Sequence, residues 1–565
     1  MKQEIDLIKL VAAIQSSERR MKPFVDTRRN MLKAYAGRRY GRGHSEVTPI
    51  NTLWNTVHAL IPSLVSANPQ VMVSPRNKFM GTLKSEARKL ELALNDELKL
   101  IHMRKIVADA VRDALFQLGI VKTGLCYEDD KPELYCCIVD FEDLILDTGA
   151  ENIDQVSFIG NKFKVRRDFA IESGLYDVEK LKMISTVNIQ IDDKKLSDFS
   201  KGPNFYEDYS DYIELADIFL PNEKRVVTID ANFTSANGYL RDVEYVGPIC
   251  DGMGPYSVLG FSWMPKNAIP ISPMSIIYDN HILLNKLATK AGRQAERSKD
   301  IVVGNKTASD DAKVIQDSDD GDIILLGDIS KFNNLAFGGS NPKLYEQISF
   351  LTEQISRMAG NANLLAGVSA DQKTATQSQI LLGNAANLVG SRKQSVSDFV
   401  KNIVGKLAWY MLHSTKTYEL EIDVPGTHAV PVKLDTTNLA GNFVDFQFDI
   451  DEYSLAPSTP EQKAAKVMTY VTQVILPLSQ IGMMNGKVID PTKLLDMISN
   501  LDNIPELNEI FVNITPEMAA QAAQMQGGVG PIASKGVVSQ ASPTQVQEGR
   551  PTQPSQPEPQ PTEIK

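Results

Sequence analysis

The amino-acid sequence predicts an α+β fold that is mainly helical. Several long segments repeat apolar residues at helical spacing. The clearest is 341–360, where steps of four, three, four and three connect Leu344, Ile348, Leu351, Ile355 and Met358. Shorter runs rich in β-branched and aromatic residues, between 121 and 249 and between 418 and 453, predict strands. A hydrophobic fraction of 42% and a charged fraction of 23% are typical of a globular protein with a substantial core.

The first 120 residues predict three helices and one strand. A helical stretch begins the chain, and between Glu18 and Gly43 it holds nine Lys or Arg against two acids. This basic stretch fits either a nucleic-acid-binding arm or a solvated helix face that runs into a Gly-rich loop. An apolar helix follows and stops at Asn68-Pro69, before a short strand over 71–74. A long amphipathic helix is then predicted over 85–118.

The middle of the chain predicts a helix, a small β-element and a second helix. Pro270 and Pro273 precede a helix that runs to about residue 299, roughly 40 Å long. Over 300–340, two apolar β-runs flank an acidic turn. Asn341-Pro342 then provides a helix cap and a first-turn proline. A polar loop follows residue 360, and a long helix is predicted from about 374 to 413.

The first of these helices carries a cationic stripe, which consists of Lys286, Lys290, Arg293 and Arg297. At about 100° per residue the four cations fall within an arc of roughly 60°. Apolar and small residues lie on the opposite side, namely Ile277, Leu284, Ala288, Ala291 and Ala295. Since small residues permit close helix approach, we expect that side to face another helix and the cations to be left uncovered.

Charge and cysteine content restrict the class of protein. A formal net charge of −11 argues against a surface that binds nucleic acid everywhere, although it permits local basic patches. The four cysteines form no CxxC pair, which predicts buried free thiols and a reducing compartment. The first residues do not resemble a signal peptide, and no apolar run is long enough to cross a bilayer. We therefore expect a soluble protein that is made in a cytoplasm.

The sequence lacks the common motifs of catalysis. It contains no GxxxxGK[ST] phosphate loop, no HExxH, no Cys/His cluster at metal spacing and no GxSxG. The best candidate for a metal-dependent nuclease is a group of acids over 140–147, read as a strand: Asp140, Glu142, Asp143 and Asp147. Strand alternation would place Asp143 opposite Asp140 and Glu142, so we expect neither an enzyme nor a cofactor.

The order of helix, inserted β-element, helix, loop and long helix resembles the portal proteins of tailed bacteriophages. Several stretches are similar to that family: "NTLWNTVHALIPSLVSANPQVMVSP", "ADAVRDALFQLGIVKTGLCYEDD", "VDFEDLILDTGAENIDQVSFIGNKFKVRRD" and "PISPMSIIYDNHILLNKLATKAGRQAE". The resemblance covers roughly residues 20 to 515. It implies a ring, typically of twelve subunits, at one capsid vertex, through which double-stranded DNA is packaged and ejected.

The resemblance also implies a division of this chain into portal regions. These are the wing over 1–270 and 380–455, stem helices over 271–299 and 341–360, the clip over 300–340, a tunnel-type loop over 361–379, and a helical crown over 456–515. In the loop, we single out Asn361, Asn363, Lys373 and Gln377. Residues 516–565 are rich in Gly, Pro, Gln, Ser and Thr and predict a mostly disordered tail.

The partners implied are other copies of the chain, DNA bound without sequence specificity, the large terminase subunit, head-to-tail adaptor and tail proteins, and the major capsid or scaffolding protein. The expected location is the virion, after synthesis in the host bacterium. Acids of the clip could dock basic surfaces of terminase or an adaptor, or could form a plain solvated turn: Asp310, Asp311, Asp317, Asp319, Asp320 and Asp322. We also expect the clip strands to pair with those of a neighbouring subunit.

Two questions stay open at the level of sequence. The cationic stripe has three potential counterparts, which are DNA phosphates in the channel, acids on an adjacent subunit, and the capsid around the stem. The alternative functions are another virion structural protein, such as a capsid or adaptor component, and a DNA-processing enzyme that uses the acids over 140–147.

Overall fold

A computed structural model describes residues 6–37, 50–65, 68–77, 81–128, 131–186, 211–232, 238–245, 252–297, 299–304, 313, 332–337, 341–360, 375–414, 416–422, 430–435 and 441–450. The described chain is a mixture of helix and sheet in which helix predominates, which confirms the predicted α+β, mainly helical class. The expected crown and tail lie outside the described residues.

The α-helices, in chain order, are α1 (Leu7–Ala36), α2 (Thr52–Leu64), α3 (Gly81–Leu100), α4 (Met103–Phe116), α5 (Arg167–Glu172), α6 (Val178–Met183), α8 (Pro273–Glu296), α10 (Pro342–Met358) and α12 (Ala375–His413). Short 3-10 turns are η1 (Ile153–Gln155) and η6 (Phe443–Asp445). Prolines are tolerated at the first helical position, and both α8 and α10 begin in that way, after the N-caps Ser272 and Asn341.

The strands are β1 (Val71–Pro75), β2 (Gly119–Glu128), β3 (Lys131–Val139), β4 (Leu144–Leu146), β5 (Ile159–Arg166), β6 (Tyr212–Leu220), β7 (Arg225–Asp230), β8 (Glu244–Tyr245), β9 (Tyr256–Leu259), β10 (Lys299–Gly304), β11 (Phe332–Phe337), β12 (Thr417–Ile422), β13 (Val430–Asp435) and β14 (Phe446–Ile450). They form a five-stranded sheet in the order β4-β5-β6-β7-β8, a three-stranded sheet in the order β3-β2-β9, and the pairs β1-β14, β10-β11 and β12-β13. All of these pairings are antiparallel.

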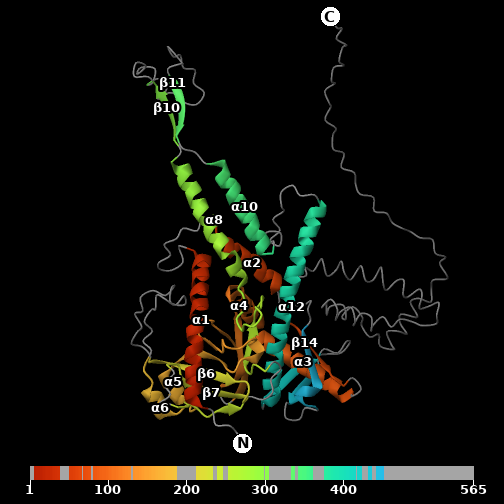
Figure 1. The fold of residues 1–565 in the computed structure, drawn as a ribbon. Helices are drawn as coiled ribbons and strands as arrows, with labels where there is room; N and C mark the ends of the chain where they lie inside the picture. Colours follow the sequence, from red (N-terminus) through yellow and green to blue (C-terminus); the bar gives the residue numbers. More distant parts are fainter. Residues whose placement is uncertain are drawn as a thin grey trace, which may run out of the picture.

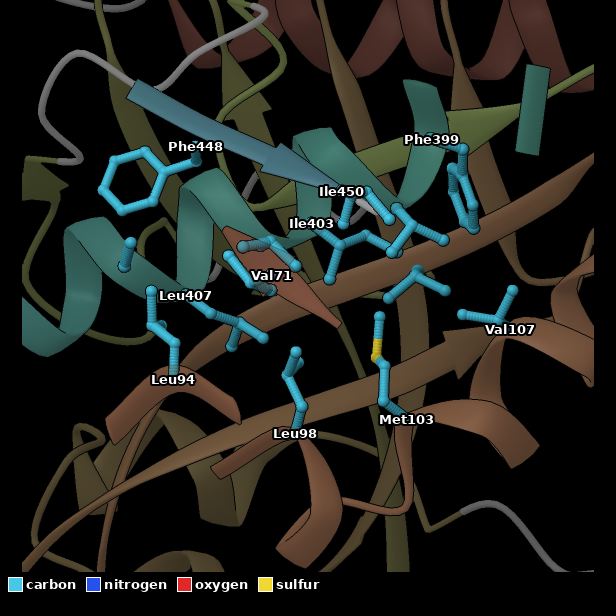
Figure 2. Close-up of a cluster of buried hydrophobic side chains, with 14 of the residues drawn as sticks. Val71, Leu94, Leu98, Met103, Val107, Phe399, Ile403, Leu407, Phe448 and Ile450 are labelled. Carbon is cyan, nitrogen blue, oxygen red and sulfur yellow. The ribbon is translucent and has the colours of Figure 1, made fainter. Parts of the chain in front are cut away.

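The main core joins segments that are far apart in sequence. Buried side chains of α3, α4 and α12 pack with those of β1 and β14, as Figure 2 shows for Leu94, Met103, Ile403, Val71 and Ile450. Further buried clusters lie where α1 contacts the two larger sheets. We call all described elements except α8, α10, β10 and β11 the body.

The remaining four elements project from the body as a stem (Figure 1). Helices α8 and α10 run beside each other, and the β10-β11 hairpin lies at their far end. A fourth buried cluster holds the root of the stem, where Ile277 and Leu284 of α8 and Ile355 of α10 pack with α2 and the end of α4. Among the described residues, the stem is therefore a two-helix arm that packs on the body at its root.

The predicted helix over 85–118 is two helices, which corrects the sequence-based prediction. The break falls at His102, whose φ of 55° lies in the left-handed region. No glycine or proline marks this position, and the apolar pattern continues across it because α3 and α4 contribute to the same core. The turn lets α4 pack on β2 while α3 packs on β1.

Two smaller predictions also need correction. Helix α12 begins at Ala375, close to the predicted start at about 374, so Gln377, which the resemblance placed in the tunnel-type loop, lies in the first turn of the helix. The cysteines described are free thiols as expected, but Cys126 and Cys137 are exposed. Both lie on the face of the β2-β3 pair that strand alternation turns away from the main core.

Candidate functional site: the projecting stem

Helix α8 is fixed to the body by its first residues. The N-cap Ser272 accepts a hydrogen bond from the Ser275 amide at 3.2 Å and donates its hydroxyl hydrogen to the Leu115 carbonyl at 2.8 Å. Ser272 is buried, so the cap connects the start of the stem directly to the end of α4. The direction of the stem is thus set by a polar contact within an apolar surrounding.

A second polar contact holds α8 between three and four turns further on. Asn285 clamps the backbone of Ile50: its Oδ1 accepts from the Ile50 amide at 3.0 Å, and its Nδ2 donates to the Ile50 carbonyl at 3.1 Å. One turn earlier, Nδ1 of the buried His281 lies 2.7 Å from Thr52 Oγ1. Burial lowers the pKa of His281 to about 4, so the imidazole is neutral at neutral pH.

The cationic stripe lies on the uncovered side of α8, as predicted. Lys286, Lys290, Arg293 and Arg297 are all exposed, and none of them has an ion-pair partner within the described residues. On a helical wheel the stripe lies roughly 140° from the buried Leu284 and Ala291. The stripe therefore faces away from the side of α8 that packs within its own chain.

The packing partner of the opposite side is α10 of the same chain. Helix α10 presents four residues of the predicted seam, since Leu344 and Ile355 are buried and Ile348 and Leu351 are half-buried, whereas Met358 at the end of the helix is 40% exposed. On α8, Ala291 is buried and Ala288 half-buried, while Ala295 near the free end is exposed. The small residues thus allow close approach of α8 and α10 along most of the stem.

The tip and the tunnel-type loop are described only in part. Strands β10 and β11 pair with each other in register from Lys299–Phe337 to Gly304–Phe332. The predicted clip acids Asp310, Asp311, Asp317, Asp319, Asp320 and Asp322 lie outside the described residues, as do Asn361, Asn363 and Lys373. Their docking and loop roles stay predictions.

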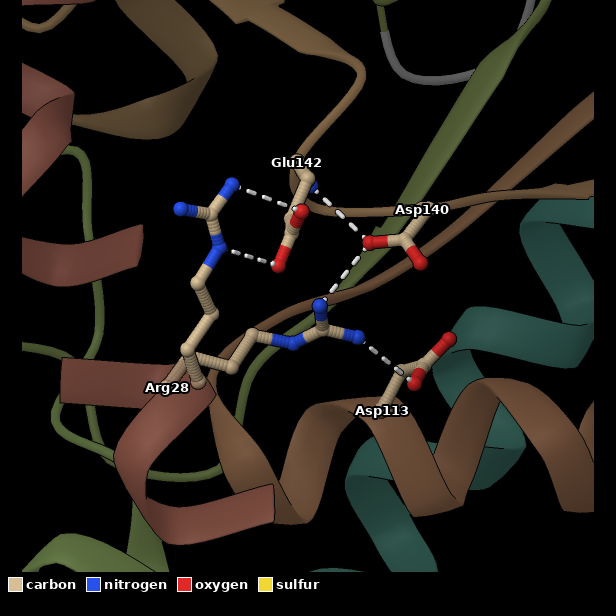
Figure 3. A network of polar contacts seen from close by, with 5 residues as sticks. Arg28, Asp113, Asp140 and Glu142 are labelled. Atoms are coloured by element: carbon tan, nitrogen blue, oxygen red, sulfur yellow. Dashed lines mark hydrogen bonds and ion pairs between the residues drawn. The ribbon is translucent and has the colours of Figure 1, made fainter. Parts of the chain in front are cut away.

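Two of the acids proposed as an alternative catalytic site, Asp140 and Glu142, take part in an ion-pair network (Figure 3). Arg28 of α1, only 3% exposed, contacts Asp140 at 2.8 Å and Asp113 of α4 at 3.1 Å. Arg29 forms a two-bond pair with Glu142, at 2.9 and 3.0 Å. These contacts bind α1 to α4 and to the segment between β3 and β4.

That segment is a turn, which corrects the strand assumed from its alternation. Strand β3 ends at Val139 and β4 begins at Leu144. Asp140 Oδ1 accepts from the Glu142 amide at 2.9 Å, and Asp147 accepts from the amides of Gly149 and Ser157. Among the described residues, no group of three or more His, Cys, Asp or Glu side chains could hold a metal ion.

The arginines of this network change the interpretation of the basic N-terminal stretch. In sequence, Arg28 and Arg29 appear among nine cations and suggest a nucleic-acid arm or a solvated face. In the structure their charges are directed inward to acids 85 to 113 positions later in the chain. Burial raises the pKa of Asp113 to about 6, although Arg28 opposes this shift. Only the i to i+7 repeat of Met21, Arg28 and Tyr35 on one helix face could have signalled that Arg28 points inward.

Comparisons with known proteins do not assign the chain to a family. No model of a protein family matches it, and no curated protein is significantly similar. Within the part of the chain described, no helix is both long and apolar enough to cross a membrane.

Proposed function

We propose that this chain is a portal protein of a tailed bacteriophage. In this proposal, copies of the chain form a ring at one capsid vertex, and double-stranded DNA passes through the central channel during packaging and ejection. The chain itself supplies no catalysis, and a separate terminase drives the DNA.

The observation that carries the proposal is the stem. A two-helix arm with a β-hairpin at its tip projects from a mixed body, and its helices lie at 273–296 and 342–358. This matches the order and position of stem, clip and stem in the family that the sequence resembles. Within the described part of the chain the arm packs on the body only at its root, so its exposed sides are available to neighbouring copies or to DNA.

The charge of the chain also supports a conduit. A formal net charge of −11 per copy disfavours tight adhesion of DNA to most of the surface. DNA must slide through a channel without being held, so a largely acidic surface suits that task. We further propose that terminase, adaptor and tail proteins dock on the clip, and that capsid or scaffolding protein surrounds the ring.

The test is imaging of the purified full-length chain. Negative-stain micrographs should show rings with a central hole, and sedimentation should give a mass close to twelve copies of 62.4 kDa. The proposal is contradicted if the purified chain stays monomeric, or forms compact dimers without a hole, at concentrations as high as those at which virions assemble.

A further inference from the structure

The two outer faces of the stem carry opposite charge. On α8 the exposed face is the cationic stripe. On α10 the exposed Glu346 and Glu353 lie roughly 180° around the helix from the seam that packs on α8. The acids therefore point away from the cations of their own chain, and the two sets can meet only between different copies.

The two helices are aligned so that these charges lie at matching heights. Asn280 Nδ2 donates to the Met358 sulfur at 3.3 Å, which places residue 280 level with 358. The pairing of Lys299 with Phe337 just beyond the helices gives nearly the same alignment. With a rise of about 1.5 Å per residue in each antiparallel helix, Glu353 is level with roughly residue 285, and Glu346 with roughly residue 292.

The pattern of charge reverses at the root of the stem. Asp279 lies on the same side of α8 as the stripe. By the alignment above, Arg357 on the outer face of α10 is level with roughly residue 281, about half a turn from Asp279. From root to middle, α8 thus presents one acid followed by three cations, and α10 presents one cation followed by two acids. Arg357 also pairs with Glu353 of the same chain at 2.7 Å.

Large apolar side chains are exposed beside the charges on both faces. Leu283 is 46% exposed next to the stripe, and Phe350 is 59% exposed next to the acids. By the same alignment Phe350 is level with roughly residue 288, about one and a half turns above Leu283. Apolar residues flanked by complementary charge are typical of a protein interface.

We propose that the cationic face of α8 packs side by side against the acidic face of α10 in a second copy of the chain. Lys286 then lies beside Glu353, and Lys290 and Arg293 lie beside Glu346. The two faces differ, so the contact is heterologous and repeats from copy to copy until the rotation closes a ring. The proposal rests on the proposed function in one respect, because it takes the second copy to be the next subunit of the ring. It assigns the stripe to protein and not to DNA.

The test uses two charge-reversed variants of the full chain. The stripe variant carries Lys286→Glu, Lys290→Glu and Arg293→Glu, and the acid variant carries Glu346→Lys and Glu353→Lys. Each variant alone places like charges at every interface. When the variants are mixed, an alternating ring restores an attractive contact at each position.

At low salt we expect each variant alone to lose about ten-fold or more in apparent self-association, from the loss of several exposed ion pairs. An equimolar mixture should recover assembly with equal numbers of the two chains, as measured by native mass spectrometry and sedimentation. All five substitutions in one chain should restore assembly without a partner. Because every substituted residue is exposed, circular dichroism and the melting temperature of each variant should match the wild type.

Other outcomes overturn the proposal. If the stripe faces DNA, the stripe variant assembles like the wild type but retains less double-stranded DNA, while the acid variant behaves normally in both assays. Failure of the mixture to assemble, when both variants are folded, also excludes the contact. Self-association that follows the charge pairing but never yields a ring with a hole would support the contact and contradict the portal function.

Discussion

Arg28 in the body and Lys290 in the stem are both cations on long helices, but their surroundings differ. Arg28 is 3% exposed and contacts Asp113 and Asp140, whereas Lys290 is exposed and has no ion-pair partner within the described residues. Arg28 joins elements of the body to each other, and Lys290 faces outward from the stem. An ion pair inside one chain fixes a fold, while a row of exposed cations leaves its counterpart to another molecule. The predictions below test this difference.

The largest effect should come from removing the buried cation. Arg28→Met leaves Asp113 and Asp140 without this cation and should cost about 3–5 kcal/mol of unfolding free energy at pH 8, well above the pKa of Asp113. The matched control is Arg293→Met in the stem, which should change stability by less than about 0.5 kcal/mol. Chemical denaturation measures both, and equal effects would show that the body and the stem do not differ in this way.

A second contrast uses leucines. Leu407 of α12 is 1% exposed in the main core, and Leu407→Ala should cost about 2–4 kcal/mol from lost burial and a cavity. Leu283 of α8 is 46% exposed, so Leu283→Ala should cost about 1 kcal/mol or less in a dilute sample. In assembled samples, Leu283→Ala should also weaken self-association. Leu407→Ala should leave self-association unchanged at temperatures where the variant is folded.

The root of the stem should respond to acid. Burial lowers the pKa of His281 from its ordinary value of 6.5 to about 4, so the folded state binds this proton less readily than the unfolded chain. The stability from the neutral ring is complete above pH 6.5 and is lost as the pH falls towards 4, by up to roughly 3 kcal/mol. Asp113, with a pKa raised to about 6, acts with the opposite sign between pH 4 and 6.

The variants His281→Gln and Asp113→Asn separate the two contributions. The pH profile of the unfolding free energy should lose its acid decline in His281→Gln and become steeper in Asp113→Asn. An unchanged profile in His281→Gln would show that this imidazole is accessible to protons in the folded protein.

The smallest effect is expected at the C-terminus. Residues 549–565 are mostly Gln, Pro, Glu, Ser and Thr and cannot form a core, so their removal should leave the melting temperature and ring assembly unchanged. Sedimentation of the truncated chain is the measurement. A loss of assembly would mean that these residues take part in subunit contacts.

The stem was more predictable from the sequence than the body's polar network. The seam of α10 and the caps Ser272 and Asn341 are local patterns, and local patterns determine local structure. By contrast, the acids at 140 and 142 appeared to be a cluster in their own right, because their arginines precede them by 112 and 113 residues. The break at His102 was missed for a related reason: tertiary packing imposes it, and no turn residue marks it.

The pairing of β1 with β14 has a consequence for synthesis. Val71 pairs with Ile450 and Pro75 with Phe446. During synthesis, β1 therefore cannot form this pairing until β14 has been made. At the usual pace of 5–20 residues per second, the ribosome needs roughly 20 to 75 s to make the intervening stretch. During that time the stem and hairpin emerge while the edge of β1 is unpaired. The nascent chain is therefore open to wrong pairing with other nascent chains on the same polysome, and to chaperones that cover strand edges, until translation passes residue 450.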